Sequence, residues 1–111
     1  MTLSTHILDT ALGRPAPNVD VTLSQFDGES WQAIGLSPTD ADGLCKTLLS
    51  SHPLLAATYK LRFHTAPYFQ SLNLPTLYPY IEIVFTVTDP TQHHHIPLLL
   101  TANGYTTYRG S

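Results

Sequence analysis

Apolar and polar residues alternate in short runs along most of the chain, and Pro, Gly, Asn and Asp separate the runs. A period of two places apolar side chains on one face of a β-strand and polar side chains on the other. The clearest run covers residues 19–26, where Val21 and Leu23 are expected to point inward between polar neighbours. Asp27-Gly28 follows at once and is typical of a hairpin turn. The pattern therefore predicts an all-β fold.

Eight such runs predict eight strands, and one further segment predicts a short α-helix. Pro67 suits the first turn of a helix over residues 66–74, and Pro75 would end it. No repeat and no long linker divides the chain, so residues 1–111 are predicted to form one domain, an eight-stranded antiparallel β-sandwich. The segment 12–18 is predicted to be a turn-rich loop. The predicted strands are residues 3–10, 19–26, 30–36, 44–49, 57–64, 81–88, 93–101 and 105–109.

Charged residues make up only 12% of the 111 residues, against roughly 25% in a typical soluble domain. A surface so poor in charge is expected to be partly buried in an oligomer. The five Lys and Arg residues are scattered along the chain, so we expect no nucleic-acid partner. No apolar run approaches the roughly 20 residues of a transmembrane helix, and no membrane partner is expected.

Cysteine content and the two ends of the chain bear on the compartment. Cys45 is the single cysteine, which excludes an intrachain disulfide. The N-terminal residues lack the charged and apolar regions of a signal peptide. The final Arg-Gly-Ser differs from the peroxisomal Ser-Lys-Leu signal, although that difference does not separate the cytosol from the peroxisome. The expected localisation is therefore cytoplasmic or peroxisomal.

The segment 92–111, QHHHIPLLLTANGYTTYRGS, collects most of the candidate chemistry. Six histidines against five Lys and Arg indicate proton transfer near neutral pH. In the strand predicted over residues 93–101, one face is expected in the core and the other is half apolar, which is typical of a face covered by another subunit. Pro97 lacks an N–H donor and favours a sheet edge or a bulge. The predicted core face is Ile96, Leu98 and Leu100, and the other face is His93, His95, Pro97 and Leu99.

The tail after this strand adds further reactive groups. Tyr108 offers a phenol, and Arg109 offers a guanidinium fork for a carboxylate or carbonyl, or for a salt bridge. Gly110 is expected to let the tail bend where a side chain would not. Ser111 carries a hydroxyl and the α-carboxylate together.

Three segments carry a resemblance to a known family: residues 4–16 (STHILDTALGRPA), residues 93–100 (HHHIPLLL) and residues 104–111 (GYTTYRGS). They resemble the 5-hydroxyisourate hydrolases, the transthyretin-like proteins of purine catabolism. The final Tyr-Arg-Gly-Ser together with His-x-His-x-Pro-Leu-Leu-Leu is highly specific for this family. Transthyretins proper, which carry thyroid hormone, are similar in fold but lack that tail.

This resemblance implies a homotetramer, a dimer of dimers of transthyretin-like sandwiches, with sites in a channel at the dimer–dimer interface. The implied reaction is hydrolysis of the cyclic amide of 5-hydroxyisourate to 2-oxo-4-hydroxy-4-carboxy-5-ureidoimidazoline, without a metal or other cofactor. The family's N-terminal histidine maps to His6, and the histidine before Ile-Pro maps to His95. Its tail tyrosine maps to Tyr108, and its terminal serine maps to Ser111.

One position departs from the family pattern. The family usually has arginine after the Asp-Gly turn, where this chain has Leu44. Lys46 lies two residues on, hence on the same strand face, and it offers a point charge in place of a planar fork. The alternative interpretation of Lys46 is an ordinary surface lysine that is exposed to solvent and has no role in the site. Arg109 is the other candidate for the missing cation.

Amide hydrolysis needs a deprotonated water, a stabilised oxyanion and a protonated leaving nitrogen. An imidazole with a pKa of about 6.5 accepts a proton at neutral pH, so we expect His6 and His95 to act as a pair, with the order of their roles open. Arg109 or Lys46 would stabilise the oxyanion, while Tyr108 and the terminal serine would hold the planar ring.

Three alternatives belong to other classes of site. Imidazoles of His6, His93 and His95 would suit a zinc centre, but no acidic residue lies near enough in sequence to support them. A transthyretin-like protein that binds a small aromatic ligand without hydrolysis fits the loss of the arginine at Leu44. A serine-nucleophile hydrolase is disfavoured because Ser111 lacks a Gly-x-Ser-x-Gly context.

Overall fold

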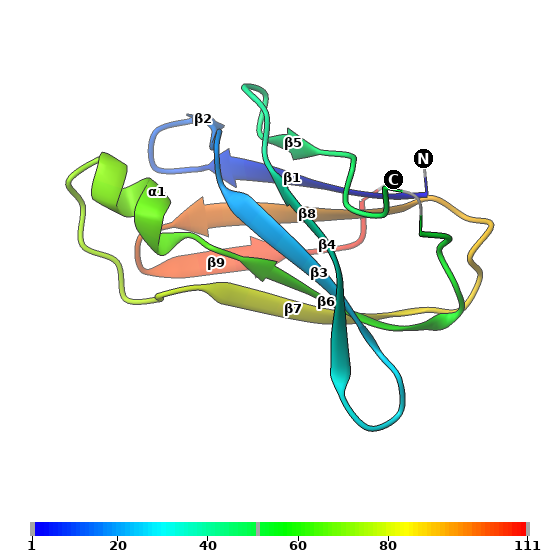
Figure 1. Cartoon of the computed structure of the whole chain (residues 1–111). Helices are drawn as coiled ribbons and strands as arrows, with labels where there is room; N and C mark the ends of the chain where they lie inside the picture. The colour runs from blue at the N-terminus through cyan, green and yellow to red at the C-terminus, as the bar shows by residue number, and fades with distance from the viewer. Residues whose placement is uncertain (1, 51, 111) are drawn as a thin grey trace.

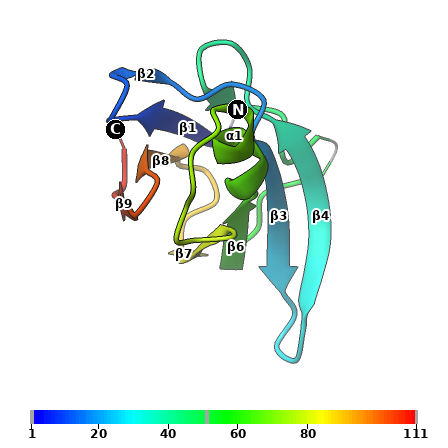
Figure 2. The ribbon, with the colours of Figure 1, turned by 90° about the vertical axis from the view of Figure 1, so that its left-hand side faces the viewer.

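The chain is described by a computed structural model over residues 2–50 and 52–110. Two β-sheets pack face to face, and one short helix lies at one end of the sandwich (Figure 1). Figure 2 shows the two layers side by side. The predicted class, an all-β sandwich with one short helix, is confirmed. The described residues contain no helix long and apolar enough to cross a membrane.

The first sheet contains the first and the last strand of the described residues. Its strand order is β2-β1-β8-β9, and β5 pairs with the same edge of β1 that β2 uses further along. Its strands are β1 (Leu3–Asp9), β2 (Arg14–Pro15), β5 (Leu44–Cys45), β8 (His94–Thr101) and β9 (Gly104–Thr107).

The second sheet has the order β4-β3-β6-β7 and is antiparallel throughout. Its strands are β3 (Asp20–Phe26), β4 (Trp31–Pro38), β6 (Ala57–Phe63) and β7 (Ile81–Val87), and α1 (Ala66–Ser71) follows β6. Alternation explains which side chains form the core, because Val21 and Leu23 of β3 are fully buried beside their β6 partners Phe63 and Leu61.

The expectation of purely antiparallel sheets is wrong in one place. β1 and β8 run parallel over seven pairs, from Leu3 beside His94 to Asp9 beside Leu100. Parallel pairing needs a long crossover in place of a hairpin, and most of the chain separates these two strands. The local pattern therefore left their relative direction undetermined.

Over residues 2–50 and 52–110 the structure has nine strands in place of the eight predicted, and several strand bounds change, including the last strand, which is Gly104–Thr107 in place of residues 105–109. Within the predicted loop 12–18, Arg14 and Pro15 form the two-residue strand β2 against the end of β1. The predicted strand 44–49 keeps only Leu44–Cys45. The chain then turns into the sandwich, where Leu48 is fully buried and its carbonyl oxygen lies against Gly35 of β4. A side chain at Gly35 would collide with that backbone, so this approach depends on glycine.

The helix begins where the sequence predicts but ends early. Pro67 lies in the first turn, and the helix ends at Ser71 in place of residue 74. Asn73 adopts a left-handed φ of 57°, and its N–H donates to the carbonyl of Gln70. A left-handed residue of this kind closes a helix, so the stop precedes Pro75.

Pro97 illustrates how sheet order and local pairing differ. β8 lies between β1 and β9 in the sheet, so the proline is not on an edge strand. Pairing with β9 ends at Leu98 and Thr107, however, and the carbonyl of Pro97 accepts from the Thr107 hydroxyl at 2.7 Å. A residue's N–H and C=O point to the same side of a strand. The missing donor therefore faces a place where the β9 ladder has already stopped.

Candidate active site

The parallel pairing of β1 with β8 brings two histidines together on the outer face of the first sheet. Ser4 lies beside His95, and His6 lies beside Pro97. The rings of His6 and His95 have centroids 6.5 Å apart and planes tilted by 37°. Both side chains are half-buried. The pair predicted from opposite ends of the sequence is thus adjacent in the structure.

The turn before β5 orients the His6 ring. Nε2 of His6 lies 2.8 Å from the backbone carbonyl oxygen of Asp42. A carbonyl only accepts, so Nε2 must carry the proton, and neutral His6 presents its Nδ1 lone pair for proton transfer. Gly43 permits this turn at a φ of 75°, and a Cβ there would collide with the backbone oxygen of Ile7.

The serine beside His95 connects it to a third histidine. Oγ of Ser4 lies 2.7 Å from Nδ1 of His95 and 3.1 Å from Nε2 of His93. The rings of His93 and His95 are stacked, with centroids 6.3 Å apart. His93 is exposed, whereas Ser4 is buried. Sequence reasoning placed Ser4 on the His6 face but gave it no role, and its alternation with His6 is the signal that pointed to it.

Burial lowers the pKa of His95 below its usual value of 6.5, and the positive charges of His6 and His93 lower this pKa further. A hydrogen bond at Ser4 acts in the opposite direction without reversing the shift. His95 is therefore the neutral, proton-accepting form at neutral pH, as a general base requires.

The tail packs directly against the His95 residue. The N–H of Gly110 donates to the carbonyl of His95 at 2.8 Å. A Cβ at Gly110 would stand 2.5 Å from Cδ2 of the His95 ring. Gly110 is not among the residues with positive φ. The sequence predicted that this glycine allows a bend in the tail. In the structure, the absence of a side chain at Gly110 instead leaves room for the His95 imidazole.

The other two tail side chains, Tyr108 and Arg109, line a hollow that does not include His6 or His95. Tyr108 is 55% exposed, and the Arg109 guanidinium donates to the side-chain oxygen of Gln92 at 3.0 Å. Both residues line a hollow of about 250 Å³ that also includes Ile83 of β7 and Ile96 of β8. Within one protomer, the structure does not bring them to His6 and His95. Ser111, the other predicted tail residue, lies outside the described residues.

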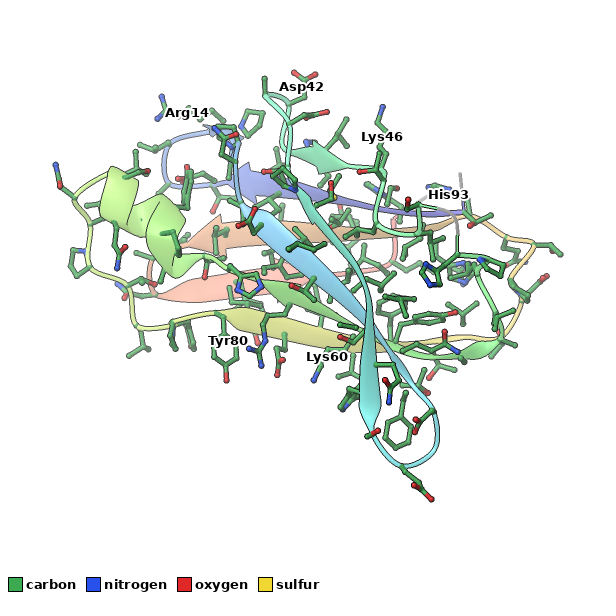
Figure 3. All side chains as sticks on the ribbon, viewed as in Figure 1. Arg14, Asp42, Lys46, Lys60, Tyr80 and His93 are labelled. Atoms are coloured by element: carbon green, nitrogen blue, oxygen red, sulfur yellow. The ribbon has the colours of Figure 1, made fainter. Side chains whose placement is uncertain are left out.

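Leu44 and Lys46 also take different places. Leu44 pairs directly with His6 across β1 and β5, so an apolar side chain occupies the position of the family's arginine. Lys46 lies beyond the end of β5 and is exposed. It lines a separate hollow of about 610 Å³ with Thr2 and His52, and Figure 3 shows it extending away from the sandwich.

The zinc alternative finds no geometric support in residues 2–50 and 52–110. No three His, Cys, Asp or Glu side chains in these ranges are arranged to hold a metal ion. Both His6 and His93 keep their ring centroids more than 6 Å from that of His95. The Ser4 hydroxyl links His93 to His95, whereas His6 is bonded separately to the Asp42 carbonyl.

Comparison with known proteins agrees with this architecture. The model of the HIUase/Transthyretin family matches residues 3–110. The chain is 44% identical to mouse 5-hydroxyisourate hydrolase, over 98% of this chain and 94% of that protein. The structure of Klebsiella pneumoniae 5-hydroxyisourate hydrolase is similar over the full length of both chains, with 35% identity and a TM-score of 0.86.

A transthyretin is also similar in structure. Sea bream transthyretin in complex with thyroxine has 29% identity and a TM-score of 0.91, over 99% of this chain and 95% of that one. The full-length family match, the identity to curated hydrolases and the shared sandwich all agree. The chain belongs to the HIUase/Transthyretin family.

Proposed function

We propose that this protein hydrolyses the cyclic amide of 5-hydroxyisourate by the attack of water. The observation that carries the proposal is the juxtaposition of His6 and His95, with ring centroids 6.5 Å apart, in a chain 44% identical to a 5-hydroxyisourate hydrolase. The product is 2-oxo-4-hydroxy-4-carboxy-5-ureidoimidazoline, in which the opened amide has become a carboxyl group and a ureido nitrogen.

The two imidazoles divide the proton transfers between them. His95, whose pKa is lowered by burial and by its histidine neighbours, accepts a proton from the attacking water. His6, held through Nε2 by the Asp42 carbonyl, turns Nδ1 to the reacting groups and orients the water. Positioned acid–base groups of this kind contribute roughly 10²–10⁴-fold to a rate.

The remaining predicted residues enter this proposal across subunits. The histidine pair lies on the outer face of a sheet, so a second protomer must cover it to exclude water. Tyr108, Arg109 and Lys46 point elsewhere in one protomer, and we assign them to substrate contacts at such an interface, together with Ser111. A cation from this set stabilises the developing oxyanion in place of the arginine absent at Leu44.

The assembly we propose is an oligomer, and more specifically a homotetramer built as a dimer of dimers. Among the described residues, β7 and β9 each end a sheet and pair with another strand on one side only, and exposed strand edges readily pair with another chain. Tyr105 and Val84 on these edges are well exposed. Light scattering on the purified protein is expected to give the mass of four 12.2 kDa chains, and a monomer at working concentration would contradict the proposal.

The direct test is spectroscopic. Freshly generated 5-hydroxyisourate is mixed with the protein, and its ultraviolet decay is followed with and without enzyme. We expect strong acceleration that survives exhaustive chelation. An unchanged decay rate would contradict the hydrolase proposal, and loss of the rate on chelation would restore the metal alternative.

One observation favours a second candidate function, small-molecule binding without hydrolysis. Leu44 pairs with His6 where a cation is expected, and sea bream transthyretin, similar in fold, is described in complex with thyroxine. Calorimetric titration with an aromatic ligand, in a protein that leaves 5-hydroxyisourate decay unchanged, would establish this candidate. Measured turnover excludes it as the sole activity.

A further inference from the structure

The Ser4 hydroxyl joins a half-buried imidazole to an exposed one. Its Oγ lies 2.7 Å from His95 Nδ1 and 3.1 Å from His93 Nε2, although Ser4 and His95 are 91 positions apart in the chain. The parallel register places Ser4 directly beside His95. The serine is 5% exposed, so its hydroxyl has little access to solvent and bonds to these two ring nitrogens.

A serine hydroxyl has one proton to donate and can accept others. In one arrangement Ser4 donates to His93 Nε2 and accepts from His95 Nδ1–H, which leaves His95 Nε2 free as a base. In the other arrangement Ser4 donates to His95 Nδ1 and accepts from His93 Nε2–H. These two arrangements differ only in the positions of the protons along the hydrogen bonds from His95 through Ser4 to His93. The hydroxyl therefore couples the tautomers of the two rings.

The proposed hydrolysis leaves a proton that must be removed. Of the two protons of the attacking water, one ends on the ureido nitrogen, which is neutral and remains so. The other is released when the new carboxyl group ionises at neutral pH. Each turnover therefore delivers one surplus proton to the site, and His95 lies half-buried beneath Gly110.

We infer that Ser4 is a positioning residue that relays this surplus proton from His95 to His93, an inference that rests on the proposed hydrolysis. His95 Nε2 takes the proton from water, and Nδ1–H of the same ring passes its proton to Ser4 Oγ. The Ser4 O–H proton moves to His93 Nε2. No electrons are transferred, and the net change is one proton moved from water to the exposed ring, which releases it to solvent.

The charged surroundings of His95 are compatible with this direction. From β1 the titratable neighbour is His6, and preceding β8 it is His93, both of which lower the pKa of His95 when they are charged. From β5 the neighbouring outer-face side chain is the neutral Leu44, with Lys46 beyond the strand end. From the tail, Arg109 is bonded to Gln92. A protonated His95 is thus disfavoured and readily gives up its proton.

The relay predicts a specific response to substitution and buffer. Ser4→Ala and His93→Gln are expected to lower kcat about tenfold or more, with KM within about twofold, and Ser4→Thr should restore the rate. Imidazole buffer should accelerate both slow variants because a small proton carrier replaces the relay. Ser37→Ala removes a hydroxyl bonded only to Thr47 on the exposed surface and serves as the control, with unchanged kcat and no buffer effect.

A merely structural role for Ser4 would lower kcat without rescue by imidazole, and that result would overturn the relay, as would wild-type kcat in Ser4→Ala. Should the wild-type protein fail to turn over 5-hydroxyisourate, the proposed function fails, and histidine titration by NMR still tests the relay. Replacing His95 by Asn should then shift the titration of His93 by a larger amount when Ser4 is present than in the Ser4→Ala background, where only the direct charge coupling of the two rings remains. An equal shift in both backgrounds would overturn the relay.

Discussion

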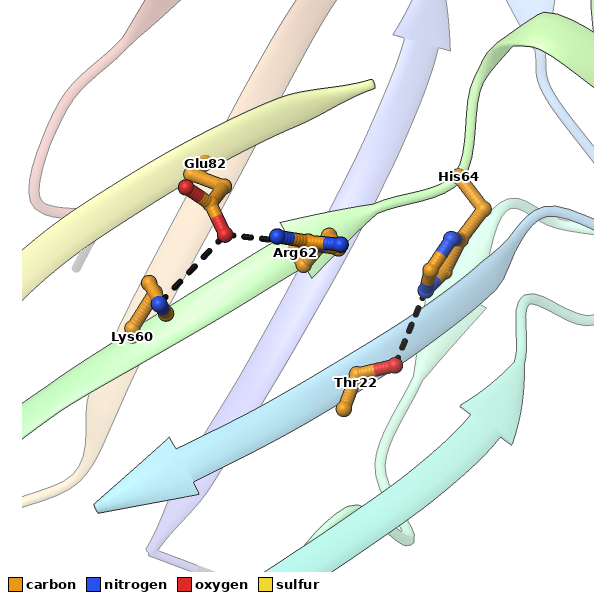
Figure 4. Close-up of polar contacts among 5 residues, drawn as sticks. All are labelled: Thr22, Lys60, Arg62, His64 and Glu82. Atoms are coloured by element: carbon orange, nitrogen blue, oxygen red, sulfur yellow. Dashed lines mark hydrogen bonds and ion pairs between the residues drawn. The ribbon is translucent and has the colours of Figure 1, made fainter. Parts of the chain in front are cut away.

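The outer faces of the two sheets use histidine and charge in opposite ways. On the second sheet, Lys60 and Arg62 share one carboxylate oxygen of Glu82, at 3.5 and 2.9 Å, and His64 bonds to Thr22 at 2.9 Å (Figure 4). On the first sheet, His6 and His95 are bonded to a backbone carbonyl and a serine hydroxyl. The partners that the structure describes for this pair are all neutral.

The difference shows which face can change its charge. In the Glu82 cluster, opposite charges on neighbouring strands compensate one another, and the cations also lie over rings, Lys60 4.5 Å from Trp31 and Arg62 4.2 Å from Tyr80. The contacts of Arg62 and Lys60 lower the pKa of the Glu82 carboxyl. Around His95, by contrast, burial and the charges of His6 and His93 lower the pKa of the imidazole, so its neutral form is favoured. We therefore locate the chemistry on the first sheet and a structural role on the second.

The largest effect is expected from removing the histidines of the first sheet. His95→Asn and His6→Asn should each lower kcat for 5-hydroxyisourate by about 100-fold or more, since each removes an acid–base group. His64→Asn is the matched control on the second sheet and should keep the wild-type rate. Ultraviolet decay assays measure all three, and wild-type rates in both first-sheet variants would remove the proposed pair.

The next effect is expected from crowding His95 without removing it. Gly110→Ala places a Cβ where the ring now lies, 2.5 Å from Cδ2, so the ring must shift and kcat should fall about tenfold by loss of acid–base positioning. Gly104→Ala is the control, because its Cβ would meet nothing closer than the Thr101 hydroxyl at 3.7 Å. Equal values of kcat in the two variants would show that the contact between Gly110 and His95 does not affect catalysis.

The pH dependence of turnover is expected to follow the titration of His95. In the proposed mechanism His95 acts as a base in its neutral form, so activity is expected above its pKa and should be lost as pH falls through it. Because this pKa is lowered from 6.5, the acid limb of the kcat/KM profile should have its midpoint below pH 6.5. The profile is measured in steady state across buffers of constant ionic strength, and a midpoint above pH 6.5 would assign the acid limb to another group.

The smallest effect is expected on the second sheet. Burial tends to raise the pKa of Glu82, but the hydrogen bond and charge of Arg62, with the charge of Lys60, outweigh it and the pKa is lowered. This carboxylate therefore stabilises the fold above its unfolded pKa, and the contribution is lost as pH falls through the folded pKa.

Glu82→Gln should accordingly reduce the free energy of unfolding by less than about 1 kcal/mol at neutral pH, because the pair is solvent-screened. Urea denaturation at pH 7 and pH 3 measures this difference, which should shrink at the lower pH. The kcat should remain that of the wild-type protein. A loss of turnover in this variant would end the division of roles between the two faces.

Local patterns in the amino-acid sequence predict which residues face the core and which segments hold the candidate catalytic residues. Alternation is a local property, so the inward set Ile96, Leu98 and Leu100 follows from a period of two and is buried in the structure. The start of the helix at Ala66, with Pro67 in its first turn, is local too. The family likewise follows from short motifs at both ends of the chain, and it is confirmed over residues 3–110.

The contacts between these distant segments are visible only in the tertiary structure. The parallel pairing of β1 with β8 joins distant segments, and its register alone places Ser4 beside His95 and brings His6 to the same face. The role of Asp42 had no side-chain signal, because its backbone carbonyl makes the contact. In the tail, the backbone N–H of Gly110 bonds to the His95 carbonyl, whereas the Arg109 side chain bonds to Gln92. Long-range pairing decides these contacts, and local periodicity carries no information about it.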